Sequence, residues 1–215
     1  MQLGDNVQAY QVEYCMFDKI TIKGSIPQDG GAAPVSVEGS FFGRQLTTHA
    51  FTAALSLCSV TPMNAKLARL YLDTAWAGVG GTEVPLLRDF QIEIMTGVHP
   101  VFNGASGLTF TKHLESYIDY TATFTLDGGT TAHALLTLQR AGTFQVARLA
   151  INGPVIGSGT NHLAQFDMGG ILETVGPDDS ADRGDNLSSV VLHGIYDVTG
   201  AKGLQAKVIC HQSVI

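Results

Sequence analysis

Charged side chains are scarce in this sequence. They make up 14% of its 215 residues, whereas a soluble globular domain typically carries about 25%. Apolar residues account for 45% and the mean hydropathy is +0.17, which excludes an intrinsically disordered chain, because disorder requires low hydrophobicity and high charge. So little charge is also unusual for the surface of a lone monomer, and we therefore expect other molecules to cover part of it.

Basic residues are few as well. The chain has 12 Lys and Arg against 19 Asp and Glu, which gives a formal net charge of -7. A protein that holds nucleic acid tightly needs clustered basic residues to neutralise phosphates, and here they are scattered. The composition argues against tight binding of DNA or RNA, but it is compatible with a surface past which DNA slides.

Long apolar runs and cysteine pairs are missing. The longest uncharged stretch, Gln45 to Ala65, contains many polar residues and Pro62, so we expect no membrane partner. The first residues lack the basic start and apolar run of a secretory signal, which predicts synthesis in the cytoplasm. Cys15, Cys58 and Cys210 are odd in number and far apart, which predicts reduced and mostly buried thiols.

Signatures of catalysis are not found either. The sequence contains no G-x-S-x-G nucleophile elbow, no G-x-x-x-x-G-K-[ST] phosphate loop and no dinucleotide fingerprint. Its seven histidines stand singly, without the spacing of a metal site. We therefore predict no catalytic residues, no cofactor, no metal and no enzymatic activity.

The dominant pattern that is present is alternation of apolar and polar residues between glycine-rich turns. In Tyr117–Leu126 apolar residues occupy the even positions, and Asp or Thr occupies the odd positions from 119 onward. Leu87–Thr96 alternates in a similar way. Strands of this kind belong to a sheet with one face in water. About ten such strands predict a mainly β fold, an antiparallel β-sandwich or barrel formed by residues 1–215 as a single domain.

One segment breaks the alternation. Ala132–Ala141 has helical spacing, with Thr130 or Thr131 as the expected N-cap and Gly142 as the C-terminal stop. We predict that it forms the one flanking α-helix.

Glycine, proline and low periodicity predict several loops. We expect loop insertions at about 24–34 and 43–64. Further loops or turns are expected at Gly97–Gly107, at Gly169-Gly170 and in the acidic segment Gly176–Asn186.

Several short stretches follow one another in a particular order between Val35 and Val208. They are Val35–Gly39, Gly43–Gln45, Phe51–Leu55, Ala68–Asp73, Leu87–Phe90, Asp119–Leu126, Leu138–Gly142 and His193–Asp197. In this order they resemble the tail tube (major tail) proteins of long, non-contractile bacteriophage tails.

The resemblance implies a tail-tube-like β-sandwich or barrel with one flanking helix. It implies that copies of the chain assemble into hexameric rings, which stack into a conduit for genome DNA. The partners would be further copies and other phage tail proteins, DNA would pass only transiently, and the protein would reside in the tail of the virion.

Two sets of residues are candidates for this function. The polar positions of the alternating strands are expected to face the lumen, although the sequence alone does not orient the sheet: Asp89, Gln91, Glu93, Asp119, Thr121, Thr123 and Thr125. The uncharged loops are expected to be covered by neighbouring subunits, through Pro27, Asp29, Pro34, Phe51, Leu55 and Leu57.

Two alternatives stay open. The chain could be another virion component, such as a contractile-tail tube, a tail terminator or a gene-transfer-agent tail protein. It could also be a β-sandwich binding module or an enzyme whose site is assembled from residues distant in the sequence.

Overall fold

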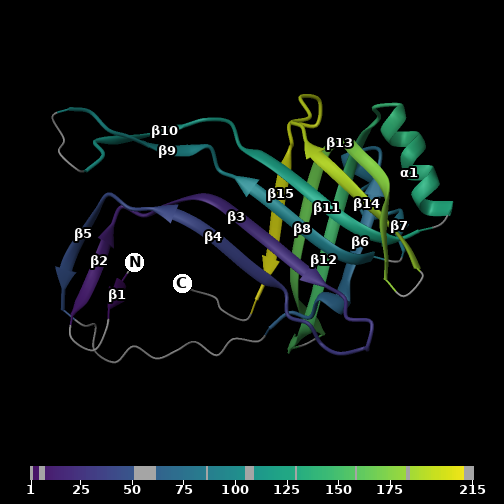
Figure 1. Cartoon of the computed structure of the whole chain (residues 1–215), viewed down its shortest axis with the longest axis horizontal. Helices are drawn as coiled ribbons and strands as arrows, with labels where there is room; N and C mark the ends of the chain where they lie inside the picture. Colours follow the sequence, from purple (N-terminus) through teal and green to yellow (C-terminus); the bar gives the residue numbers. More distant parts are fainter. Residues whose placement is uncertain are drawn as a thin grey trace. The chain divides into compact units, whose positions relative to one another are not determined.

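The computed structural model of the protein describes residues 2–4, 8–50, 62–85, 87–104, 109–128, 130–157, 159–182 and 185–210. Antiparallel strands dominate this part of the chain, accompanied by one α-helix (Figure 1). The strands form sheets of three, two and ten strands. The mainly β, sandwich-like fold with one helix is therefore confirmed. The barrel alternative is wrong, because the large sheet is not closed on itself.

The chain divides into two compact units. Unit 1 consists of Met1–Thr21, Val37–Thr61 and Ile94–Asp119, and unit 2 of Ile22–Ser36, Pro62–Glu93 and Tyr120–Ile215. Each unit is described by itself below.

Unit 1 contains the two small sheets. The three-stranded sheet has the order β1-β2-β5 and the other pairs β9 with β10. The bounds are β1 Gln2–Gly4, β2 Ala9–Glu13, β5 Gln45–His49, β9 Val98–Val101 and β10 Lys112–Glu115. Strands β5 and β9 lie where loops were expected, so those two predictions are partly wrong. Strand β5 pairs with β2, which is distant in sequence, from Ala9↔His49 to Glu13↔Gln45. Strand β9 pairs with the next strand, β10, from Val98↔Glu115 to Val101↔Lys112, so in both cases a partner strand satisfies the backbone.

The large sheet has the order β4-β3-β8-β11-β14-β13-β12-β6-β7, and β15 pairs with β13. Its strands are β3 Met16–Ser25, β4 Ser36–Phe42, β6 Ala68–Asp73, β7 Glu83–Val84, β8 Leu87–Met95, β11 Asp119–Asp127, β12 Phe144–Gly157, β13 Thr160–Asp182, β14 Asp185–Gly194 and β15 Leu204–Ile209. The helix α1 spans Thr130–Arg140, and two short 3-10 turns span Ala65–Leu67 and Trp76–Gly78. The predicted loop between β3 and β4 is confirmed, because β3 ends at Ser25.

The core of unit 2 follows from alternation in register across the strands. Leu149 of β12 lies opposite Leu70 of β6 and Phe166 of β13, and Ala122 of β11 lies opposite Leu192 of β14. Directly opposed residues share a sheet face, so apolar residues gather on one side. The fully buried large side chains of this core are Leu70, Ile92, Phe124, Leu126, Gln145, Val146, Leu149, Ile151, Met168, Val190 and Leu192.

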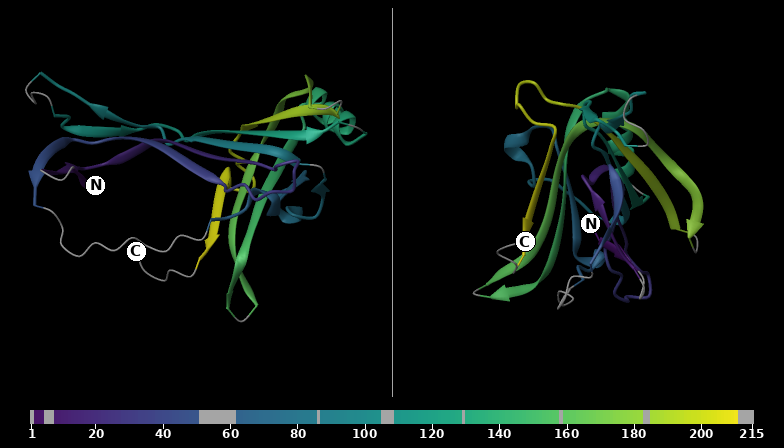
Figure 2. Two further views of the ribbon diagram at one scale, coloured as in Figure 1. Left: turned by 60° about the horizontal axis from the view of Figure 1, so that its bottom comes forward. Right: turned by 90° about the vertical axis from the view of Figure 1, so that its left-hand side faces the viewer.

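Gly169-Gly170 lies inside β13 and does not form the predicted turn. A Cβ at Gly169 would lie 2.8 Å from the rings of both Phe144 and Trp76, and one at Gly170 would collide with the carbonyl of His193. The two glycines are needed for close approach within a strand. Figure 2 shows that β13 bends, so that the part paired with β12 and β15 slopes away from the part paired with β14.

The acidic segment 176–186 was also predicted to be a loop. Instead β13 continues to Asp182 and β14 begins at Asp185, so the two strands extend as a hairpin. Ladder hydrogen bonds extend this hairpin although the composition of the segment is typical of a turn.

The end of helix α1 is as predicted. Gly142 has φ +59°, its N–H donates to the carbonyl of Gln139, and the N–H of Thr143 donates to that of Leu138. This is a Schellman motif, which requires the left-handed conformation that glycine adopts readily. The helix begins at Thr130 itself, so the expected N-cap at Thr130 or Thr131 is wrong.

Two of the three cysteines are visible in the described chain. Cys15 and Cys210 are both exposed, so the expectation of mostly buried thiols is wrong for them, and Cys58 lies outside the described residues. Among the helices of the described chain none is long and apolar enough to cross a membrane.

Candidate functional site

Unit 2 presents a polar face on β11 and β14. Tyr120, Ala122, Phe124 and Leu126 of β11 are buried, and the residues between them are half-buried. The polar face continues onto β14, because opposed residues share a face. The opposed pairs are Thr121↔His193, Thr123↔Val191 and Thr125↔Ser189.

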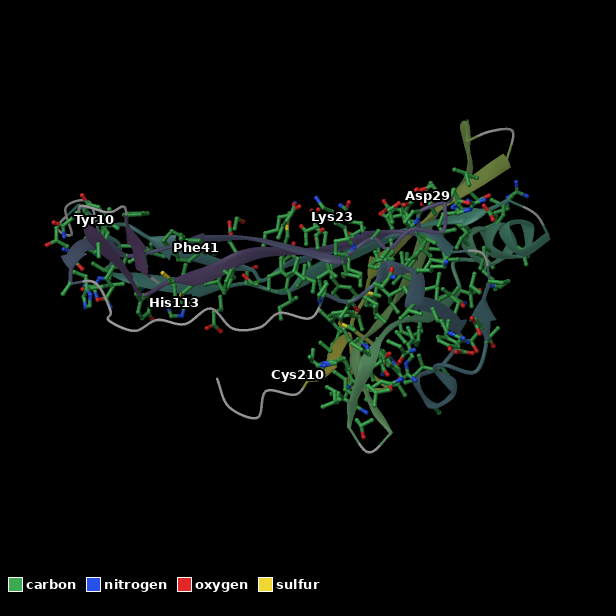
Figure 3. All side chains as sticks on the ribbon, turned by 90° about the horizontal axis from the view of Figure 1, so that it is seen from below. Tyr10, Lys23, Asp29, Phe41, His113 and Cys210 are labelled. Atoms are coloured by element: carbon green, nitrogen blue, oxygen red, sulfur yellow. The ribbon has the colours of Figure 1, made fainter. Side chains whose placement is uncertain are left out.

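A groove of about 440 Å³ lies over this polar face. Four of the predicted lumen residues line it: Asp89, Gln91, Thr123 and Thr125. Lys23 of β3, labelled in Figure 3, lines it too. Lys23 was not among the predicted residues, although its alternation with the apolar Ile22 could have indicated that it lies on the polar face of its strand. The groove is therefore not purely acidic, because an ammonium group accompanies the Asp89 carboxylate.

The other three predicted lumen residues lie elsewhere. Thr121 is opposite His193, beyond the groove, and Glu93 is half-buried on β8. Asp119 belongs to unit 1, where it lines a separate hollow of about 450 Å³ with Met95 and Tyr117.

The predicted contact residues of the loop 24–34 are tied to unit 2. Asp29 Oδ1 accepts a hydrogen bond from the N–H of Gly31 at 2.9 Å, and Pro34 forms a β-bridge with Asn64. Pro27 and Asp29 line a hollow of about 350 Å³ beside Arg88. Asp29 and Pro34 nevertheless remain exposed, so these bonds leave them open to a neighbouring subunit, while the other candidates, Phe51, Leu55 and Leu57, lie outside the described residues.

The ionic groups near these hollows have partners. Arg88 Nε donates to Asp127 Oδ1, and both side chains are largely buried. Elsewhere in unit 2, Arg148 Nε and Nη2 donate to the two carboxylate oxygens of Asp167 at 2.6 and 2.8 Å. The hydrogen bond from Arg148 to Asp167 raises the pKa of the guanidinium, although burial opposes the shift. Both arginines therefore stabilise the fold. Because each is paired with a carboxylate and largely buried, it is not available to bind another anion.

Asp73 closes the turn after β6. Its Oδ2 accepts hydrogen bonds from the N–H groups of Gly80, Gly81 and Thr82 at 2.9, 3.2 and 3.5 Å. Burial by itself would raise the pKa of Asp73, but hydrogen bonds from the Thr82 side chain and from these backbone groups outweigh it, so the pKa is lowered.

Unit 1 is organised by aromatic rings. Phe110 is 2% exposed, and its ring centroid lies 5.9, 5.6 and 6.2 Å from those of Tyr14, Phe42 and Phe102. Tyr14 Oη lies 3.1 Å from Nδ1 of His113, which is labelled in Figure 3. The sequence analysis missed this cluster, because its members come from four separate segments.

The described residues include no group of three or more His, Cys, Asp or Glu placed to hold a metal ion. A scan against models of protein families finds none that matches this chain. A search of curated proteins finds no match either. Arguments about function therefore rest on the fold and on the surfaces of the two units.

Proposed function

We propose that this chain is the structural subunit of a bacteriophage tail tube, which polymerises as stacked hexameric rings into a conduit for genome DNA. The observation that carries the proposal is the incomplete packing of unit 1. Among its described residues only Ala9 and Phe110 are buried apolar side chains. In contrast, Phe17 is 55% exposed, Val37 68% and Tyr117 82%.

The apolar area exposed on unit 1 is large for a monomer. Its exposed large apolar residues are Tyr10, Tyr14, Phe17, Val37, Phe41, Leu46, Met95, Phe102, Leu114, Tyr117 and Ile118. Scaling side-chain areas of up to about 250 Å² by the exposed fractions gives roughly 1,200 Å². These residues lie on several strands, so this total is compared with the area that one partner buries in a standard interface, about 800 Å². An area of this size suits a subunit whose surface is covered on assembly.

The open edges of the large sheet support the same proposal. The order of its strands begins at β4 and ends at β7. An unpaired edge exposes backbone N–H and C=O groups and promotes uncontrolled association unless another strand covers it. Head-to-tail contacts between copies can close into a ring, which would cover edges of this kind on every subunit.

The polar face of unit 2 suits the wall of a DNA channel. The groove is lined by the neutral polar side chains of Ser25, Ser36, Gln91, Thr123 and Thr125, by the apolar Ala33, Pro34 and Phe90, and by one Lys and one Asp. A wall of mostly uncharged groups forms few phosphate contacts, so DNA can slide without being held. On this proposal the groove residues Asp89, Gln91, Thr123 and Thr125 face the lumen.

Negative-stain electron microscopy of the purified full chain tests the proposal. We expect rings and stacked tubes that persist at high salt, because apolar contacts are not screened. Monodisperse monomers at all concentrations would contradict it. Isolated rings that never stack would favour a tail terminator instead.

The groove of unit 2 favours a second candidate, a β-sandwich binding module. Its convergent Lys, Asp, Gln and Thr side chains could hold a small polar ligand. A monomeric protein whose melting temperature rises with such a ligand, and falls back when Gln91 is replaced by Ala, would support this candidate over the tube.

A further inference from the structure

An apolar row crosses β3 and β4 in unit 1. The rings of Phe17 and Phe41 are in edge contact, with centroids 6.1 Å apart. A Cβ at Gly39 would lie 3.1 Å from the Phe17 ring, so this ring lies over the glycine backbone. Val37, Gly39 and Phe41 alternate along β4 and therefore share one face. Phe41 is labelled in Figure 3.

Met95 of β8 extends the row on the other side of β3. The N–H of Thr96 donates to the carbonyl of Asp18 at 2.9 Å, which places these two residues opposite each other. Met95 then lies opposite Lys19, on the same face as Phe17. Phe17, Val37, Phe41 and Met95, here called the Phe17 row, are exposed by 55%, 68%, 38% and 48%.

We propose that a second copy of this chain packs on the Phe17 row, and that this packing buries apolar side chains that the described part of unit 1 leaves exposed. This inference rests on the proposed function and names the contact by which its subunits associate. It adds a contact to the one expected at the loop 24–34, whose Asp29 and Pro34 remain exposed.

Three observations favour a second copy as the occupant. The row by itself exposes roughly 400 Å² by the same scaling, about half of what one partner contributes to a standard interface, which suits a second copy that also covers other exposed apolar residues of unit 1. Among the described strands β4 is an edge of the large sheet, and a further strand can pair with its backbone. Asp18 and Glu38 alternate onto the opposite face, which leaves Lys19 as the charged residue beside Phe17 on the face of the row, so no cluster of like charges opposes the approach of a second copy.

A membrane fits the row less well. Lipid cannot satisfy the backbone groups of an open strand edge. An interfacial membrane segment also carries an excess of Lys and Arg, which the residues around the row lack.

The substitution Phe17→Asp tests the inference against the matched control Val198→Asp. Val198 is 83% exposed and belongs to unit 2, so both variants place the same charge on an exposed apolar position. Phe17→Ser repeats the test without a charge. We measure the critical concentration for assembly by sedimentation, and folding by circular dichroism. The Phe17 variants should remain folded and raise the critical concentration at least about tenfold, because a buried aromatic side chain is lost. Val198→Asp should assemble like the unsubstituted chain.

The outcomes separate this inference from the proposed function. Tubes that form equally well with Asp or Ser at position 17 would overturn the inference but leave the tube proposal standing. Dimers that never form rings, and that either Phe17 variant abolishes, would support the inference and contradict the tube. An unsubstituted chain that stays monomeric, or that binds lipid vesicles through this row, would overturn the inference.

Discussion

The ion pair between Arg148 and Asp167 gives a sharp test of how unit 2 is stabilised. Its two hydrogen bonds are 2.6 and 2.8 Å long, and Gln165 Nε2 adds contacts of 3.3 and 3.1 Å to the same carboxylate. The Asp167 side chain is 8% exposed and that of Arg148 24%. Breaking a buried pair costs about 3–5 kcal/mol, because an uncompensated charge remains. We expect Arg148→Met to cost about 3 kcal/mol, the lower end, since water reaches part of the guanidinium.

Urea unfolding followed by the fluorescence of Trp76 measures this cost. Trp76 is the single tryptophan of the chain and lies against Gly169 in unit 2, so it reports on this unit. With a slope of about 2–3 kcal/mol per molar urea, the midpoint should fall by about 1–1.5 M. The double variant Arg148→Met with Asp167→Leu should recover most of the loss, because no buried charge is left without a partner.

Two results would refute this reasoning. A midpoint that falls by less than about 0.3 M in Arg148→Met would mean that the pair contributes no more than an exposed one. A double variant as unstable as the single one would mean that packing of the arginine stem, and not its charge, stabilises the strands.

Three further predictions concern other parts of the molecule. Asp73→Asn should destabilise the protein at neutral pH, and the difference should shrink on acidification below pH 3.8. The folded-state pKa is lowered, so the contribution of Asp73 is present above its unfolded pKa and is lost as the pH falls through the folded pKa. Acid titration of the unfolding midpoint checks this, and a difference that is constant with pH would contradict it. Phe110→Ala should cost about 3–5 kcal/mol in unit 1; hydrogen exchange should show faster exchange there, with unit 2 unchanged. Asp89→Lys with Gln91→Lys should leave tubes intact but slow DNA ejection, because added cations hold phosphates; normal ejection would remove both residues from the lumen.

Two local features of the sequence led to correct predictions: the alternation of apolar and polar residues, and the glycine that ends a helix. The period of two in 119–126 predicted which side chains of β11 are buried, because a strand directs successive residues to opposite faces wherever it is placed. Gly142 predicted the end of α1 for a similar reason: the left-handed backbone of a helix terminus is a local requirement, and glycine meets it at little cost.

Other features of the fold and of the groove depend on contacts between segments that are distant in the sequence. The groove residues Asp89 and Gln91 of β8 and Thr123 and Thr125 of β11 were predicted to share a face, but only the strand order of the sheet brings Lys23 of β3 beside them. Gly169-Gly170 lies in the middle of a strand, where neighbouring rings and a carbonyl leave no room for a Cβ. These neighbours come from other segments of the chain, so local propensity does not reveal the requirement for glycine. The ring cluster around Phe110 and the bond between Arg148 and Asp167 join distant segments. The energy of such contacts depends on burial and on which strands meet, whereas sequence periodicity reports only which face of a strand each residue occupies.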